Sequence, residues 1–322
     1  MLDFWKNTKE LETRLSAVQE IIAARLAIDD PEIQAALAVF LSKPGKMIRP
    51  ALFLLFATWE KEISERELHI AASLELLHLA TLIHDDIIDD SHTRRKQPTI
   101  QATLGKDVAV YAGDFIYTIY FEMLTETMAE TPYLAKNAAS MKRILNGELL
   151  QKANLYSQNQ TVASYLSAIS GKTAELLALA CEEGAYFGAL SPENIARARE
   201  IGRSIGLAFQ IHDDVLNFSL DFANEKPILT DVAQGIYTLP LLLALENAPE
   251  RVTPYLKTPS ALTRAELIEL AELVKSCGAL EEAHAIAQEL TDKALSELAK
   301  LPASSNQKNI EKAVKKLLVR TY

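Results

Sequence analysis

The chain carries the stretch LELLHLATLIHDDIIDD at residues 74–90, where an apolar run ends in Asp85, Asp86, Asp89 and Asp90. Such a run predicts a buried helix rather than a loop. Residues i and i+4 share one face of a helix, so Asp85 and Asp89 project together, with Asp86 beside them. Burying several carboxylates is prohibitively costly unless cations neutralise them. The stretch therefore predicts a cation site at the end of a long helix.

A second stretch repeats this arrangement about 120 residues later. IGLAFQIHDDVLNF, at residues 205–218, places Asp213, Asp214 and Asn217 in another apolar helix. Ligand sets made only of oxygen suit Mg²⁺, which keeps part of its hydration shell and shares the rest with substrate phosphates. The two stretches together predict a Mg²⁺ site that serves a phosphorylated substrate.

The rest of the chain predicts an all-α fold in a single domain, residues 1–322. Hydrophobic residues make up 49% of the 322, which is enough for a sizeable core, and Gly (11) and Pro (12) are scarce. Most segments are rich in Ala, Leu and Glu at helical spacing. Helices are predicted near 9–28, 31–42, 48–60, 64–90, 107–129, 134–156, 160–180, 192–219, 238–247, 262–275, 279–300 and 306–320.

Charge and composition exclude several classes of protein. A net charge of −10 argues against nucleic-acid binding. Cys181 and Cys277 have no pairing or metal-ligand spacing, which favours a reducing compartment. The start MLDFWKNTKE has no basic segment followed by an apolar core, so a signal peptide is not expected, and no apolar run reaches the length of about 18 residues that predicts a membrane span. A cytoplasmic protein is expected.

Five segments, in this order, resemble the trans-polyprenyl diphosphate synthase family. They are Gly45–Pro50 (GKMIRP), His78–Arg95, Gly171–Thr173 (GKT), Gln210–Asn217, and Lys226-Pro227 with Asp231 and Thr238–Pro240. One DDxxD motif is a weak signal, but two with GKxxRP are very specific. Within the family, the chain looks most like the catalytic subunit of bacterial two-component hexaprenyl and heptaprenyl diphosphate synthases. The resemblance implies an antiparallel helix bundle around a central cavity, the isoprenoid synthase fold, with both acidic clusters at its mouth.

The resemblance also implies a reaction. An allylic diphosphate ionises, isopentenyl diphosphate attacks the cation, and a proton is lost. Both substrates are polyanions, so they can bind to a site lined by carboxylates only if bridging cations offset the repulsion between the negative charges. Mg²⁺ would be held by Asp85 and Asp89, with Asp86 near, and by Asp213 with help from Asp214.

The family's other contacts can be carried onto matching positions of this chain. Lys46, Arg49, His78 and Arg95 match its contacts to isopentenyl diphosphate. Arg94, Lys172 and Lys226 match its contacts to the allylic diphosphate, and Thr173 and Gln210 match positions near the developing cation. Arginine suits bidentate phosphate binding, and lysine acts as a point charge. The catalytic residues implied are Asp85, Asp86, Asp89, Lys172 and Asp213.

The chain departs from the family pattern at several positions. Asn217 replaces the last aspartate of the second cluster and adds no negative charge. Lys96 stands where the family usually has Gly after the arginine pair. Pro44 and Met47 alter the usual GGKRxRP, and Glu225 and Leu229 replace glycines near Lys226. These changes lie around loops that close over substrate.

Two other functions stay open from the sequence. A class I terpene cyclase shares the helical fold and the first acidic cluster, but it has no need of Lys46, Arg49 and His78 for a second diphosphate. A non-catalytic partner subunit is the other alternative, supported by Asn217 and the lost glycines.

Product length and assembly are further expectations. Ala80 and Thr81 lie one turn before Asp85, where small residues resemble an open shaft in the family, so we expect a product of about C30 to C40 for a quinone side chain. Residues 107–129 are apolar around most of the helix, so part of that helix is expected to pack on another subunit. The partner is either a second copy or a small, separately encoded subunit.

Overall fold

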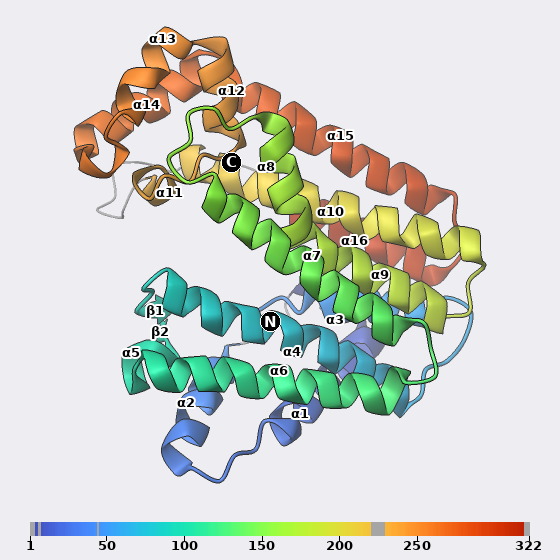
Figure 1. Cartoon of the computed structure of the whole chain (residues 1–322). Coiled ribbons are helices and arrows are strands. Elements are labelled where there is room, and N and C mark those ends of the chain that lie inside the picture. The colour runs from blue at the N-terminus through green and yellow to red at the C-terminus, as the bar shows by residue number, and fades with distance from the viewer. Residues whose placement is uncertain (1–3, 6–7, 44, 220–228, 319–322) are drawn as a thin grey trace. The chain divides into compact units, whose positions relative to one another are not determined.

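The computed structural model describes residues 4–5, 8–43, 45–219 and 229–318, and they are almost entirely helical (Figure 1). The predicted all-α class is confirmed. The elements are α1 Lys9–Arg25, α2 Pro31–Ser42, α3 Ile48–Ala57, α4 Glu65–Ile88, β1 Thr93–Arg94, β2 Gln97–Pro98, α5 Ile100–Leu104, α6 Lys106–Met128, α7 Tyr133–Ala153, α8 Val162–Ile169, η2 Ser170–Ala174, α9 Glu175–Phe187, α10 Pro192–Ser219, α11 Thr230–Ala233, α12 Leu239–Asn247, α13 Pro249–Val252, η3 Thr253–Leu256, η4 Pro259–Ala261, α14 Arg264–Ser276, α15 Ala279–Ala299 and α16 Ser305–Leu318.

The chain folds into two compact units. Unit 1 comprises residues 1–138, 180–196 and 303–310, and unit 2 comprises residues 139–179, 197–302 and 311–322. The single-domain organisation predicted from the sequence stays a prediction.

Unit 1 is built on α4. A capping box starts this helix, because the Ser64 hydroxyl and the Glu67 carboxylate satisfy backbone N–H groups in its first turn. Most of its length is buried, and it packs along α6 more extensively than along any other described helix (Figure 1). A helix buried on nearly all sides must be apolar on nearly all sides, as residues 74–83 are, apart from Glu75, His78 and Thr81. The acidic cluster therefore comes at the end of a rigid support.

In unit 2, α8, η2 and the first residues of α9 follow one another without a break, with a single turn of π-helix in the middle. The core of this unit gathers apolar residues from α8, α10, α12 and α15, including Ile169, Ile211, Leu243 and Ala283. The second acidic cluster lies in the last turns of α10, which has the predicted bounds, 192–219.

The predicted elements differ from the structure in two places that matter for the site. The sequence placed a helix near 160–180, which starts correctly but misses the π-turn over Ser170–Ala174. It also left residues 91–106 unassigned, where the structure has the β1–β2 hairpin and α5. Among the described residues, no helix is both long and apolar enough to cross a bilayer.

Candidate active site

The first acidic cluster occupies the C-terminal end of α4. Asp85 is half-buried in the last turn, and Asp89 is the exposed residue that caps the helix, with its backbone N–H donating to the Asp85 carbonyl oxygen at 2.8 Å. Asp86 is 3% exposed, and Arg94 binds it through Nε to Oδ1 at 2.9 Å and to Oδ2 at 3.0 Å. Asp85 and Asp89 are therefore the more accessible pair, and Asp86 and Arg94 hold each other.

A tight hairpin positions the two arginines that follow. Thr93 pairs with Pro98 and Arg94 with Gln97, so Arg95 and Lys96 form a two-residue turn. Both have positive φ, 51° and 64°, as a type I′ turn requires. This explains the glycine that the family has at the position of Lys96, since glycine adopts positive φ without steric cost.

Arg49, Glu75, His78 and Arg95 form an electrostatically coupled cluster in unit 1. Burial lowers the pKa of Arg49, Glu75 opposes this shift, and Arg95 adds to it. Burial raises the pKa of Glu75, and the two arginines oppose that shift. Burial and then the surrounding arginines hold the pKa of His78 well below 6.5, so its imidazole is neutral at physiological pH. The fold thus brings together three of the four residues matched to isopentenyl diphosphate.

Two atoms of this cluster are left without hydrogen bonds. Glu75 Oε2 and Arg49 Nε are buried and have no hydrogen-bond partner among the described residues. The unsatisfied Nε of Arg49 and the partly buried guanidinium of Arg95 together favour the binding of an anion at this place. Glu75, which the sequence-based interpretation missed, limits the net positive charge there. Its signal was a lone acid in the apolar run LELLH.

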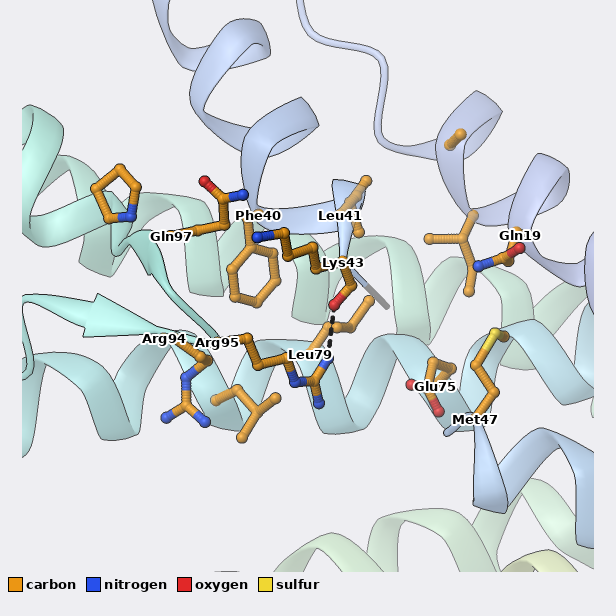
Figure 2. Close-up of a pocket in the computed structure, with 14 residues that line it drawn as sticks. Gln19, Phe40, Leu41, Lys43, Met47, Glu75, Leu79, Arg94, Arg95 and Gln97 are labelled. Carbon is orange, nitrogen blue, oxygen red and sulfur yellow. Dashed lines mark hydrogen bonds between the residues drawn. The ribbon is translucent and has the colours of Figure 1, made fainter. Parts of the chain in front are cut away.

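A cavity of ≈ 200 Å³ lies beside this cluster (Figure 2). Its walls are mostly apolar, with Phe40 from α2 and Leu79 from α4 among the lining residues, and Arg95 donates to the Lys43 carbonyl oxygen at 2.9 Å. Arg94 and Glu75 also line it. A pocket with apolar walls and cations at one side suits a small molecule with a short apolar part and an anionic group.

Gly45 and Lys46 belong to the GKMIRP segment before α3. A Cβ on Gly45 would lie 2.6 Å from Nη2 of Arg95, so only glycine allows the guanidinium so close. The Lys46 carbonyl accepts a hydrogen bond from Trp5 Nε1 at 2.8 Å, and Lys46 Nζ lies 5.4 Å from the centre of the Phe4 ring. The segment therefore positions Arg95 through its glycine and anchors the N-terminal residues through Lys46.

In unit 2, the π-turn carries Lys172 and Thr173. Such turns inside α-helices are frequent at functional sites. Lys172 Nζ donates to Gln151 Oε1 at 3.0 Å and lies 3.1 Å from Glu148 Oε2, both on α7. A Cβ on Gly147 would meet the Lys172 backbone nitrogen at 2.4 Å, which explains how α7 approaches so closely. Lys172 is thus held by two acceptors on α7, and its predicted contact with a diphosphate stays a prediction.

Thr173, Gln210, Asp214 and Tyr165 form a hydrogen-bonded chain. Thr173 Oγ1 donates to Gln210 Oε1 at 2.8 Å, and Gln210 Nε2 donates to Asp214 Oδ1 at 2.9 Å. Tyr165 OH donates to Asp214 Oδ2 at 2.5 Å. Burial raises the pKa of Asp214 to about 7, although both hydrogen bonds lower it. Asp213 is more exposed than Asp214, so of the two it is the better placed to bind a metal.

The structure explains some of the positions in and after the second acidic cluster that differ from the family pattern. Asn217 is exposed, and its Nδ2 donates to Asp231 Oδ2 at 3.3 Å, a bond that an aspartate could not donate. Leu229 has φ of +46°, which explains the glycine expected there. Pro44, Glu225 and Lys226 lie outside the described residues, so the predicted role of Lys226 stays a prediction.

The two positions assigned to product length lie inside α4. Ala80 is 0% exposed. Thr81 is half-buried, and its hydroxyl donates to the His78 carbonyl oxygen at 2.7 Å. Their predicted role in product length stays a prediction.

Asp85 and Asp89 in unit 1 and Asp213 in unit 2 supply only oxygen and lie at or near the surface of their helices, so the chemistry of each fits Mg²⁺. Within the described parts of the chain, no group of three or more His, Cys, Asp and Glu side chains is already gathered as a metal site.

Comparison with known proteins identifies the family. The polyprenyl synthetase family model matches residues 30–273. The chain belongs to the polyprenyl synthetase family. It is 33% identical over 294 residues to heptaprenyl diphosphate synthase component 2 of Geobacillus stearothermophilus, covering 91% of each chain. It is 32% identical to octaprenyl diphosphate synthase of Escherichia coli strain K12, covering 89% of this chain and 90% of that one.

Solved structures agree with this assignment. The structure of geranylgeranyl pyrophosphate synthase from Lactobacillus brevis ATCC 367 matches with a TM-score of 0.93 and 38% identity, covering 98% of this chain and 99% of that one. The isoprenoid synthase fold expected from the sequence is confirmed. The relatives are named as polyprenyl diphosphate synthases, which are transferases, so this chain is assigned to the transferases.

Proposed function

We propose that this polyprenyl synthetase is a Mg²⁺-dependent prenyltransferase that condenses isopentenyl diphosphate with an allylic diphosphate. The observation that carries the proposal is the cluster of Arg49, His78 and Arg95 beside a small, mostly apolar cavity. A terpene cyclase binds one diphosphate and needs no second cationic pocket. The cluster has the features of a site for a five-carbon diphosphate that binds without metal.

The remaining residues divide between the two substrates. Lys46, Arg49, His78 and Arg95 bind isopentenyl diphosphate. Asp85, Asp89 and Asp213 would hold Mg²⁺, which would supply charge neutralisation for the departing allylic diphosphate. Asp86 fixes Arg94, and Asp214 supports the metal site from a buried position. Lys172 and Lys226 bind the same diphosphate, and Thr173 and Gln210 direct oxygen dipoles at the positive charge that develops.

The product is proposed to be an all-trans polyprenyl diphosphate of about C30 to C40, because Ala80 and Thr81 are small and small residues at this level of the helix resemble an open shaft in the family. Heptaprenyl and octaprenyl diphosphate synthases among the similar proteins support a long chain, whereas the similar structure from Lactobacillus brevis is named a geranylgeranyl pyrophosphate synthase, so the proposed length depends on Ala80 and Thr81. A use in quinone side chains and a cytoplasmic location remain proposals of the same kind.

Assembly is proposed to involve a second chain. Val110, Tyr111 and Phe121 of α6 are 40%, 74% and 43% exposed, which is unusual for large apolar side chains on one helix. Similarity to component 2 of heptaprenyl diphosphate synthase supports a heterodimer with a small second subunit, and a homodimer is the other form. A chain that needs a partner should be weakly active alone and gain activity with lysate from its source.

The test is to incubate the purified chain with radiolabelled isopentenyl diphosphate, farnesyl diphosphate and Mg²⁺. Elongated polyprenyl products, separated by chromatography after dephosphorylation, are expected. Cyclic hydrocarbons would instead show a terpene cyclase. No product, with or without lysate, would favour the alternative of a non-catalytic subunit, which Asn217 and Lys96 keep open.

A further inference from the structure

We propose that Tyr165 is a positioning residue for prenyl transfer, which acts through Asp214 to fix the side-chain amide of Gln210. The inference rests on the proposed function. Tyr165 lies on α8 and is 4% exposed, so it is outside the set of residues expected to touch substrate. Its hydroxyl donates to Asp214 Oδ2 at 2.5 Å.

The orientation of the Gln210 amide follows from this contact. Asp214 is 4% exposed, and its Oδ1 accepts from Gln210 Nε2 at 2.9 Å. A carboxylate accepts hydrogen bonds, so it selects the NH₂ end of the amide and repels the oxygen end. The amide oxygen therefore points away from Asp214 and accepts from Thr173 Oγ1 at 2.8 Å. A rotated Asp214 would no longer determine which end of the amide faces Thr173.

Thr173 is the last residue in this series of hydrogen bonds. Its hydroxyl hydrogen is committed to Gln210, so the remaining lone pairs of its oxygen are available to a positive charge. Oxygen dipoles stabilise a developing charge best when they are fixed in advance and need no reorganisation during the reaction. Tyr165 therefore contributes to the rate although it touches neither substrate, since its hydroxyl holds Asp214, and Asp214 holds Gln210.

The chain offers a matched control in the same unit. Tyr237 is also a buried tyrosine, 1% exposed, and its hydroxyl has no hydrogen-bond partner among the described residues. Tyr165→Phe and Tyr237→Phe remove the same atom from similarly buried rings. A general effect of losing a buried hydroxyl appears in both variants, whereas the positioning effect appears only in Tyr165→Phe.

The experiment measures kcat and KM for both substrates in the wild type, Tyr165→Phe, Tyr237→Phe, Gln210→Leu and the double variant Tyr165→Phe/Gln210→Leu. Tyr165→Phe is expected to lower kcat by about tenfold or more while KM changes by less than about twofold, because it removes the support of a group rather than a substrate contact. Tyr237→Phe should match the wild type. The double variant should be no slower than Gln210→Leu, since the hydroxyl acts through that amide.

The outcomes separate the two proposals. If the wild type elongates its substrate and Tyr165→Phe is equally fast, the positioning role is wrong and the proposed function is unaffected. A further tenfold loss on adding Tyr165→Phe to Gln210→Leu also overturns the positioning role, since the hydroxyl would then act by another route. If Tyr165→Phe alone fails to fold, its hydroxyl serves the stability of the core and the inference is wrong. A wild type that does not elongate any substrate overturns both.

Discussion

Glu183, on α9 in unit 1, is a carboxyl group that the fold buries without a directly bound cation among the described residues. It is 0% exposed, and Asn137 Nδ2, itself held by Tyr120 through its amide oxygen, donates to it. Burial raises the pKa of Glu183 to about 8; the Asn137 bond opposes this shift, and neighbouring Glu182 adds to it. The folded protein therefore binds this proton more tightly than the unfolded chain.

Because the folded-state pKa of Glu183 is the higher one, its contribution to stability is present in full below about pH 4.5 and is lost as the pH rises to about 8. Glu183→Gln should remove this loss and raise the free energy of unfolding at pH 8 by roughly 2–4 kcal/mol relative to the wild type. Urea unfolding at pH 5 and pH 8 measures it, with exposed Glu289→Gln as the control. An equal effect at both pH values would contradict the assignment.

A substitution at Asn217 tests the proposed metal site at the end of α10. Asn217→Asp replaces a donor that bonds Asp231 by a second carboxylate, which favours a cation at that position. We expect the concentration of Mg²⁺ needed for half-maximal activity to fall by about threefold or more. Asn217→Ala, which removes the bond without adding charge, is the control. A higher Mg²⁺ requirement in Asn217→Asp would mean that the amide orients Asp231 for catalysis.

At the scale of elements, the hairpin β1–β2 has a turn that its sequence does not favour. Lys96 has φ of +64°, a conformation that costs an L-residue roughly 1–2 kcal/mol. Lys96→Gly should therefore raise the free energy of unfolding by roughly 0.5–1 kcal/mol, because the relieved strain exceeds the entropy cost of glycine. Urea unfolding measures it against Lys96→Ala, which removes the side chain but keeps the strain. Equal stabilities of the two variants would refute this account of the turn.

The proposed role of α4 in product length is tested within that helix. Ala80→Phe adds a ring one turn before Asp85 and should shorten the product, while the first condensation continues at a rate within about threefold of the wild type. Chromatography of the dephosphorylated products measures chain length. Unchanged length would show that the growing chain does not pass Ala80. A protein that is folded but inactive would show that this position supports the catalytic end of α4 instead.

The long elements were predictable because their signals are local. The apolar run before Asp85 and the bounds of α10 follow from helical periodicity and from residue types. The π-turn at Lys172 was not predictable, since it depends on the close approach of α7 at Gly147. Likewise, the hairpin after α4 has Lys at a position where the usual turn signal is glycine.

The candidate site was predictable only in part at the scale of the whole molecule. The motifs located Arg49, His78 and Arg95, and the fold gathers them. The counter-charges were missed, because Glu75 and Glu148 belong to no motif and their roles arise from packing between helices. The pairing of Arg94 with Asp86 was missed for the same reason, since both had been assigned to substrate and metal.

The most direct test of the central claim is the turnover of the double variant Asp85→Ala/Asp89→Ala at saturating Mg²⁺, with Asp90→Ala as its control. Asp90 lies in the same cluster but is exposed and paired with Lys106 at 2.7 Å. The double variant should remain folded and lose at least about a thousandfold in kcat, because in the proposed mechanism these two carboxylates hold the Mg²⁺ that assists the departing diphosphate. Asp90→Ala should stay within about threefold of the wild type. A double variant with near-wild-type turnover would contradict metal-assisted prenyl transfer at this site.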